Sequence, residues 1–142
     1  MKATVTWVDG MMFLGESGSG HSVVMDGAPE AGGRDHGIRP MEMLLLGMGG
    51  CTSFDVVLIL KRGREPVNGC KVEITAERAE ADPKVFTRIH LHYRISGKGL
   101  SAAKVERAIA LSKEKYCSAS IMLGATATIT SDFTLGEERA LD

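Results

Sequence analysis

A nearly unbroken run of apolar residues in the middle of the chain, from Met41 to Leu60, constrains the fold more than any other feature. Only Glu42 and Asp55 place charges in it. Pro40 suits the first turn of a helix, and the Lys-Arg-Gly sequence after the run is typical of a helix end. A run of about 20 residues also has transmembrane length, but acids inside a bilayer are costly. We therefore expect a central helix, covered by a sheet or a partner, and no membrane association.

Length and composition set the class of protein around this helix. A chain of 142 residues suits one compact domain, which we place at residues 1–142. A net charge of −1 argues against nucleic-acid binding, which usually needs a basic surface. Three cysteines are too few for a secreted disulfide scaffold, and the N-terminus lacks a signal-peptide pattern. We therefore expect a cytoplasmic protein whose thiols are free.

The segments on both sides of the central helix alternate apolar and polar residues, which is typical of half-buried strands. We expect strands over 2–8, 11–16, 21–25, 70–80, 85–95 and 125–135, helices over 40–60 and 101–116, a helical turn over 118–123, a loop over 27–39 and a frayed tail over 136–142. The first three strands should form an antiparallel meander. The order βββ-α-ββ-α-(α)-β predicts an α+β fold with mainly antiparallel sheets.

Common catalytic fingerprints are missing from the sequence. It contains no GxGxxG motif after a strand, no Walker loop, no GxSxG and no HExxH. His90 and His92 share a strand face, as metal ligands can, but Arg88 and Arg94 flank them there. Because two cations repel a metal and no acid interleaves with the pair, we expect a solvated polar face and no metal site.

The cysteines carry the most chemical information. Cys51 lies in the apolar helix directly after Gly49 and Gly50, each of which costs about 1 kcal/mol relative to alanine inside a helix. Close packing, or room beside a reactive atom, would offset that cost. Cys117 ends the second long helix, where the dipole disfavours a thiolate and the two lysines just before it partly compensate. Spacing alone allows both to be buried hydrophobes or reactive thiols; Cys70 begins a strand and has no special setting.

Two motifs resemble the OsmC/Ohr family. One is Pro-Met-Glu-Met-Leu-Leu-Leu-Gly-Met-Gly-Gly-Cys, from Pro40 to Cys51, and the other is Glu-Lys-Tyr-Cys, ending at Cys117. The segments 7–16 and 21–27 are similar too, so the resemblance covers nearly the whole chain. It implies an intertwined homodimer in which two sheets surround the central helices, and it would explain a helix too apolar for one chain to cover.

The resemblance implies a thiol peroxidase that reduces organic hydroperoxides. Cys51 would be the peroxidatic thiolate, attacking the O–O bond and becoming a sulfenic acid. Cys117 would resolve it as a disulfide, and an external dithiol would reset the enzyme. No metal, haem or flavin cofactor is implied. Two alternatives within the same fold are a protein that binds a small apolar or thiol-reactive compound, and a redox-responsive partner protein.

The residues that would activate Cys51 follow the family pattern less closely. Peroxidases of the family usually carry Glu directly after the helix-opening proline, where this chain has Met41. Glu42 is the candidate acid, but it stands nine residues before Cys51, or about 900°, which is half a turn away in a regular helix. The candidates for the activating arginine are Arg39 and, farther from the helix, Arg34.

Asp55 stands four residues after Cys51 and therefore about 40° away on the same helix face. A carboxylate in that place should raise the pKa of the thiol. A bulge at Gly47 or at the following glycine pair would be needed to rotate Glu42 toward Cys51.

Overall fold

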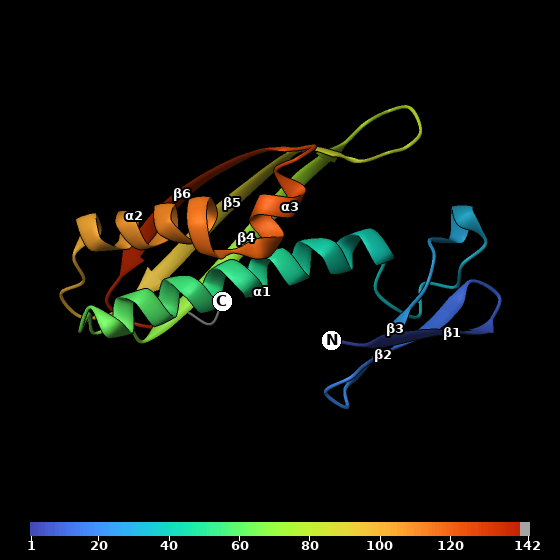
Figure 1. The fold of residues 1–142 in the computed structure, drawn as a ribbon, viewed down its shortest axis with the longest axis horizontal. Coiled ribbons are helices and arrows are strands. Elements are labelled where there is room, and N and C mark those ends of the chain that lie inside the picture. The colour runs from blue at the N-terminus through green and yellow to red at the C-terminus, as the bar shows by residue number, and fades with distance from the viewer. Residues whose placement is uncertain (140–142) are drawn as a thin grey trace. The chain divides into compact units, whose positions relative to one another are not determined.

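The computed structural model describes residues 1–139 and has two sheets and several helical segments (Figure 1). The elements are β1 (Ala3–Asp9), β2 (Met12–Ser17), β3 (Ser22–Met25), α1 (Pro40–Arg62), β4 (Gly69–Arg78), β5 (Phe86–Ser96), α2 (Ala102–Leu111), α3 (Ser118–Leu123) and β6 (Thr128–Gly136). A 3-10 turn, η1 (Pro29–Ala31), and a π turn, η2 (Ser112–Tyr116), complete the order. The expected α+β class and element order are confirmed. The expected tail over 136–142 lies partly outside the described residues.

The chain divides into two compact units, with the boundary between Leu46 and Gly47. Each unit contains one of the sheets, and α1 begins in the first unit and continues in the second. The expectation of one domain over residues 1–142 stays a prediction.

The first unit contains the antiparallel meander expected from the sequence. β2 pairs with β1 on one side and with β3 on the other, both antiparallel. The β1–β2 hairpin turns at Gly10, whose φ of 56° lies in the region that favours glycine. The indole Nε1–H of Trp7 donates to the Gly10 carbonyl at 2.8 Å and fastens this turn.

The loop between β3 and α1 is organised by one buried carboxylate. Asp26 is 2% exposed and accepts backbone N–H bonds from Gly27 at 2.7 Å, His36 at 3.1 Å and Arg34 at 3.2 Å. These bonds favour the charged form, that from His36 most strongly, and hold the pKa of Asp26 below its usual value. The loop that the sequence predicts over 27–39 is therefore held in place by backbone hydrogen bonds to the Asp26 carboxylate.

The second unit is built on the sheet β4-β5-β6. β4 pairs with β5 antiparallel, as expected, but β6 pairs with β5 in parallel. The parallel pair is connected through α2, η2 and α3, a crossover of the kind that parallel strands require. β6 starts at Thr128, later than the expected residue 125. The N–H groups of residues 125–127 instead bond to carbonyls at the end of α3.

The core of the second unit lies between one sheet face and the helices. Figure 1 shows α1 and α2 in front of the sheet, and the buried residues on β5 alternate as a half-buried strand requires. The buried side chains of this core include Met48, Thr52, Val56 and Leu60 on α1, Phe86, Ile89, Leu91, Tyr93 and Ile95 on β5, and Val105, Ala108 and Ile109 on α2. The four α1 residues recur every fourth position and so form one stripe.

On α1, only this stripe and the adjacent Gly49 are buried within this chain. Phe54 remains 69% exposed, although it belongs to the apolar run. A Cβ at Gly49 would meet Ile74 Cδ1 at 2.8 Å, so close packing explains this glycine, whereas a Cβ at Gly50 would meet open space. Among the described helices, α1 alone has the length and hydropathy to cross a bilayer, a test that core helices of soluble proteins also pass.

Candidate active site

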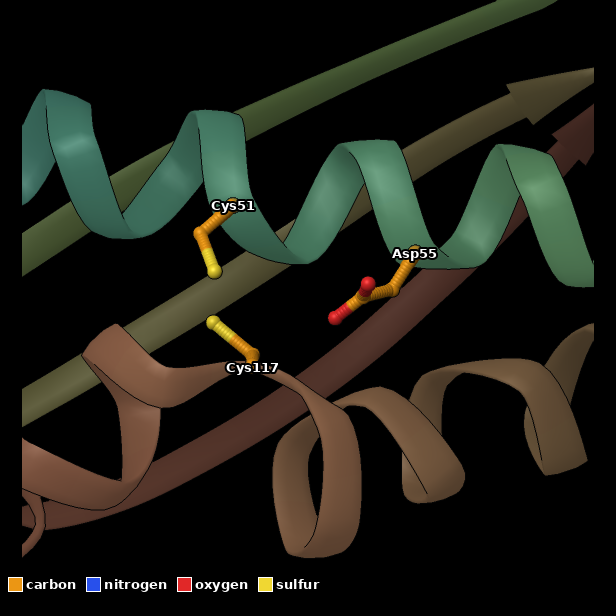
Figure 2. A group of neighbouring side chains, drawn as sticks. All are labelled: Cys51, Asp55 and Cys117. Atoms are coloured by element: carbon orange, nitrogen blue, oxygen red, sulfur yellow. The ribbon is translucent and has the colours of Figure 1, made fainter.

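Cys51, Asp55 and Cys117 form one group inside the second unit. Their sulfur and carboxylate oxygen atoms all lie within 4.8 Å of one another. Figure 2 shows the two thiols pointing toward each other, with the Asp55 carboxylate directed at the same space. Cys51 and Asp55 are one helical turn apart on α1 and therefore share a face. The structure thus brings together the two cysteines that the resemblance pairs.

A π turn places Cys117. The sequence predicts a continuous helix through Tyr116, but α2 ends at Leu111 and the Cys117 N–H bonds to the Ser112 carbonyl, five residues back, at 2.8 Å. In a regular α-helix these two residues would differ by about 140° around the axis. The wider turn brings them to the same side, toward α1.

Cys117 is also the N-cap of α3, which the sequence analysis did not anticipate. Its sulfur accepts the backbone N–H of Ser120 at 3.4 Å. Burial is the largest influence and raises the pKa of the Cys117 thiol, and the nearby Cys51 acts in the same direction. The Ser120 hydroxyl and N–H lower that pKa and offset the burial only in part.

A buried chain of hydroxyl groups is hydrogen-bonded to the Asp55 member of this group. Thr52 Oγ1 lies 2.7 Å from Tyr93 Oη and 2.8 Å from Ser112 Oγ, and Ser112 Oγ donates to Asp55 Oδ2 at 3.1 Å. Because a carboxylate only accepts, the protons run from Tyr93 to Thr52, then to Ser112, then to Asp55. Burial raises the pKa of Tyr93 to about 12, with the Thr52 bond partly offsetting it.

The sequence analysis missed this hydroxyl chain. Tyr93 and Ser112 lie 41 and 60 residues after Thr52, so spacing does not connect them. The one sequence feature that pointed to it was Thr52, a hydroxyl residue in the centre of a largely apolar helix.

Arg39 and Glu42 interact with each other and with the loop before α1. The Arg39 N–H donates to Glu42 Oε2 at 2.9 Å, which satisfies a free donor at the helix start. The Arg39 guanidinium pairs with Asp35 at 2.6 Å, and the Arg34 guanidinium pairs with Asp9 at 2.5 Å. α1 is helical without a break, so it contains no bulge that would rotate Glu42.

Cys70 lies outside the group, as the sequence analysis expects. It stands at the start of β4 opposite Ile95, and burial raises the pKa of its thiol, with a bond from Ser53 opposing. This leaves Cys70 as a matched control for experiments on the other two cysteines.

The histidine pair is less isolated than expected. His92 Nδ1 lies 2.5 Å and His90 Nε2 3.4 Å from Asp132 Oδ1 on β6, and His90 Nδ1 also contacts Thr130 at 2.8 Å. The sequence of the strand itself carries no acid there, and Asp132 comes from β6, whose parallel pairing with β5 was not foreseen.

Comparison with known proteins decides the family. A family model described as "OsmC-like protein" matches residues 32–132, well over half of the chain. The protein belongs to the OsmC-like family. Protein YhfA of Escherichia coli K12 is 47% identical over 133 residues, which cover 94% of this chain and 96% of YhfA.

Solved structures of OsmC-like proteins share the fold. A hypothetical protein from Aquifex aeolicus VF5 has 29% identity and a TM-score of 0.80, with 96% of this chain and 97% of that chain covered. An organic hydroperoxide resistance protein OsmC from Legionella pneumophila has 16% identity and a TM-score of 0.73, covering 94% and 95% of the two chains. At that identity the likeness concerns the fold alone.

Proposed function

We propose that this OsmC-like protein is a thiol peroxidase that reduces organic hydroperoxides through Cys51 and Cys117. The proposal is carried by one observation, the approach of two sulfur atoms from distant segments to within 4.8 Å of each other. A neighbour in fold is named for organic hydroperoxide resistance, which agrees with this chemistry. The fold itself hosts several functions, so the cysteine pair is what favours this one.

The difference in burial supports a different role for each sulfur. Cys51 is half-buried and therefore within reach of a substrate, whereas Cys117 is fully buried. A peroxide must reach the attacking sulfur, but a resolving sulfur needs to reach only the first cysteine. The accessible Cys51 thus suits the peroxidatic role and Cys117 the resolving role.

The reaction would proceed in three steps. The Cys51 thiolate attacks the peroxide, an S–O bond forms, the O–O bond breaks, and the alkoxide takes a proton and leaves as an alcohol. Cys117 then attacks the sulfenic sulfur, an S–S bond forms and the hydroxyl leaves as water. An external dithiol reduces the disulfide and is itself oxidised.

The cellular location and the oligomeric state of the protein are part of the same proposal. A cycle that ends with reduction by a dithiol suits the reducing cytoplasm, where disulfides are transient. A homodimer, as the resemblance implies, would cover the apolar surface that α1 exposes at Phe54.

The test is a thiol count before and after one equivalent of cumene hydroperoxide. Denatured, untreated protein should show three free thiols per chain. Treated protein should show one, because Cys51 and Cys117 form a disulfide. A Cys51→Ser variant should lose none, and a Cys117→Ser variant should retain a sulfenic acid that a dimedone probe labels.

Cys70→Ser is the matched control, because Cys70 lies outside the group and its loss should leave the reaction unchanged. If all three thiols of the wild-type protein survive several minutes with organic peroxide, the peroxidase proposal is wrong. A small-molecule-binding protein of the same fold then becomes the better explanation.

A further inference from the structure

We propose that the reduced protein binds one Zn²⁺ ion per chain through Cys51, Asp55 and Cys117. Two thiols and a carboxylate are ordinary zinc ligands, and their donor atoms already lie within 4.8 Å of one another. The sequence analysis expected no metal site. The sequence suggested only the histidine pair as possible metal ligands, and Asp55 only as a carboxylate that would raise the pKa of the Cys51 thiol.

The backbone geometry suits a metal. Cys51 and Asp55 are four residues apart on α1, a spacing that presents two ligands on one helix face, and Cys117 supplies the third from a separate segment. Tetrahedral zinc holds such donors roughly 3.5–3.8 Å apart, given bonds of about 2.3 Å to sulfur and 2.0 Å to oxygen. Because no separation exceeds 4.8 Å, the donor atoms need to approach one another by about 1 Å at most.

The negative charge of the Asp55 carboxylate, which lacks a cationic partner among the described residues, also favours a bound cation. Within residues 1–139 no lysine, arginine or histidine forms an ion pair with Asp55. The two lysines nearest Cys117 in sequence are engaged elsewhere. Lys113 Nζ contacts Ser131, and Lys115 lies over the Tyr116 ring. A bound divalent ion would displace the protons of the two thiols, and its charge would balance that of the resulting thiolates.

Groups around the ligands hold them in place. The Ser112 hydroxyl fixes one oxygen of Asp55, and the Ser120 N–H bonds to the Cys117 sulfur. The Ser120 hydroxyl is buried beside Cys117 and has no nitrogen or oxygen partner among the described residues, so it is free to donate to a metal-bound thiolate. Hydrogen bonds of this kind orient ligands at metal sites and raise their affinity.

Ligand chemistry selects the ion. Two sulfur ligands favour Zn²⁺ over Mg²⁺ or Ca²⁺, which prefer oxygen. The fourth position is open to water or an external ligand, because Cys51 is only half-buried.

Zinc and peroxide would compete for the same sulfurs, and this part of the inference rests on the proposed peroxidase function. Two thiolates, one organic hydroperoxide and two protons give one disulfide, one alcohol and one water. The ion loses both sulfur ligands and leaves. Bound zinc would therefore protect the thiols, and oxidation would release it.

The test uses the full chain, reduced and stripped of metal, titrated with Zn²⁺ against a chromophoric chelator. One ion per chain should bind, and Cys51→Ser or Cys117→Ser should abolish binding. Asp55→Asn should weaken it by about tenfold or more, and Cys70→Ser should leave it unchanged. Co²⁺ in place of Zn²⁺ should give a thiolate-to-metal charge-transfer band that Cys70→Ser retains.

Failure to bind zinc stoichiometrically in the reduced wild-type protein, or binding that Asp55→Asn leaves unaltered, overturns the inference. Circular dichroism of each variant shows whether a loss of zinc binding comes from unfolding. If a cysteine variant unfolds, the conservative Asp55→Asn variant decides whether these side chains bind zinc. The thiol count with peroxide is made on metal-free protein, so it tests the peroxidase proposal independently. Zinc binding without peroxide reactivity would reject that proposal alone.

Discussion

Thr52 connects the buried hydroxyl groups of the second unit. It is fully buried, and its hydroxyl lies between those of Tyr93 and Ser112. Thr52→Val keeps the shape of the side chain but leaves the buried Tyr93 hydroxyl without its bond. Because an unsatisfied buried polar group costs about 1–3 kcal/mol, we expect Thr52→Val to lower the free energy of unfolding by roughly 2 kcal/mol in urea titrations.

Tyr93→Phe is the control for this prediction. It removes the Tyr93 hydroxyl and with it the need for a hydrogen-bond partner, so it should lower the free energy of unfolding by only about 1 kcal/mol. The double variant should then cost less than the sum of the two single changes, because neither partner is left alone. A Thr52→Val protein as stable as the wild type would mean that the hydroxyl chain contributes nothing.

The site shows which residues a sequence can and cannot identify. Cys51 and Asp55 are one turn apart on a helix that the apolar run predicts, so their common face followed from periodicity. The pairing of Cys51 with Cys117 was implied by the family resemblance and not by spacing. Thr52 and Ser112 lie 60 residues apart, so their contact did not follow from spacing, and the π turn that places Cys117 replaces the last turn of the predicted helix.

At the scale of elements, the loop between β3 and α1 depends on the charge of Asp26. Its carboxylate accepts three backbone N–H bonds, and its pKa is lower in the folded protein than in the unfolded chain. A lowered carboxyl pKa contributes stability that is present above the unfolded value of about 3.9 and is lost as pH falls through the folded value.

We therefore predict that Asp26→Ala opens this loop at neutral pH, with hydrogen exchange at the Arg34 and His36 amides faster on the order of tenfold. The wild-type protein should show the same loss of protection only below about pH 4. Glu30→Gln, a change at an exposed residue of the same loop, should leave exchange unaltered. Equal protection of these amides in Asp26→Ala and wild-type protein would show that the carboxylate does not order the loop.

Most elements were predictable because each carries its own pattern. β5 alternates buried and open positions, and the meander has turn glycines between its strands. β6 alternates equally well, but alternation does not reveal the partner or direction of a strand. Its parallel pairing with β5, and hence the place of Asp132 beside His92, therefore required the structure.

At the scale of the whole molecule, α1 has more apolar surface than one chain covers. Its buried side chains form a single stripe with Gly49 beside it, and Phe54 is 69% exposed. Burying a phenylalanine side chain is worth about 1.5–3 kcal/mol, so an exposed one on a central helix favours association. The exposure of Phe54 thus favours a dimer independently of the family resemblance that implies one.

We predict that the protein sediments at twice its chain mass of 15.2 kDa at micromolar concentration. Phe54→Glu should shift it toward the monomer by about tenfold or more in dissociation constant, because the charge would have to be buried in the interface. Phe54→Leu keeps an apolar side chain and should remain dimeric. Since Phe54 makes little contact within its own chain, both variants should fold, which circular dichroism verifies. A wild-type monomer, or a Phe54→Glu variant that stays dimeric, would show that this face of α1 is not the interface.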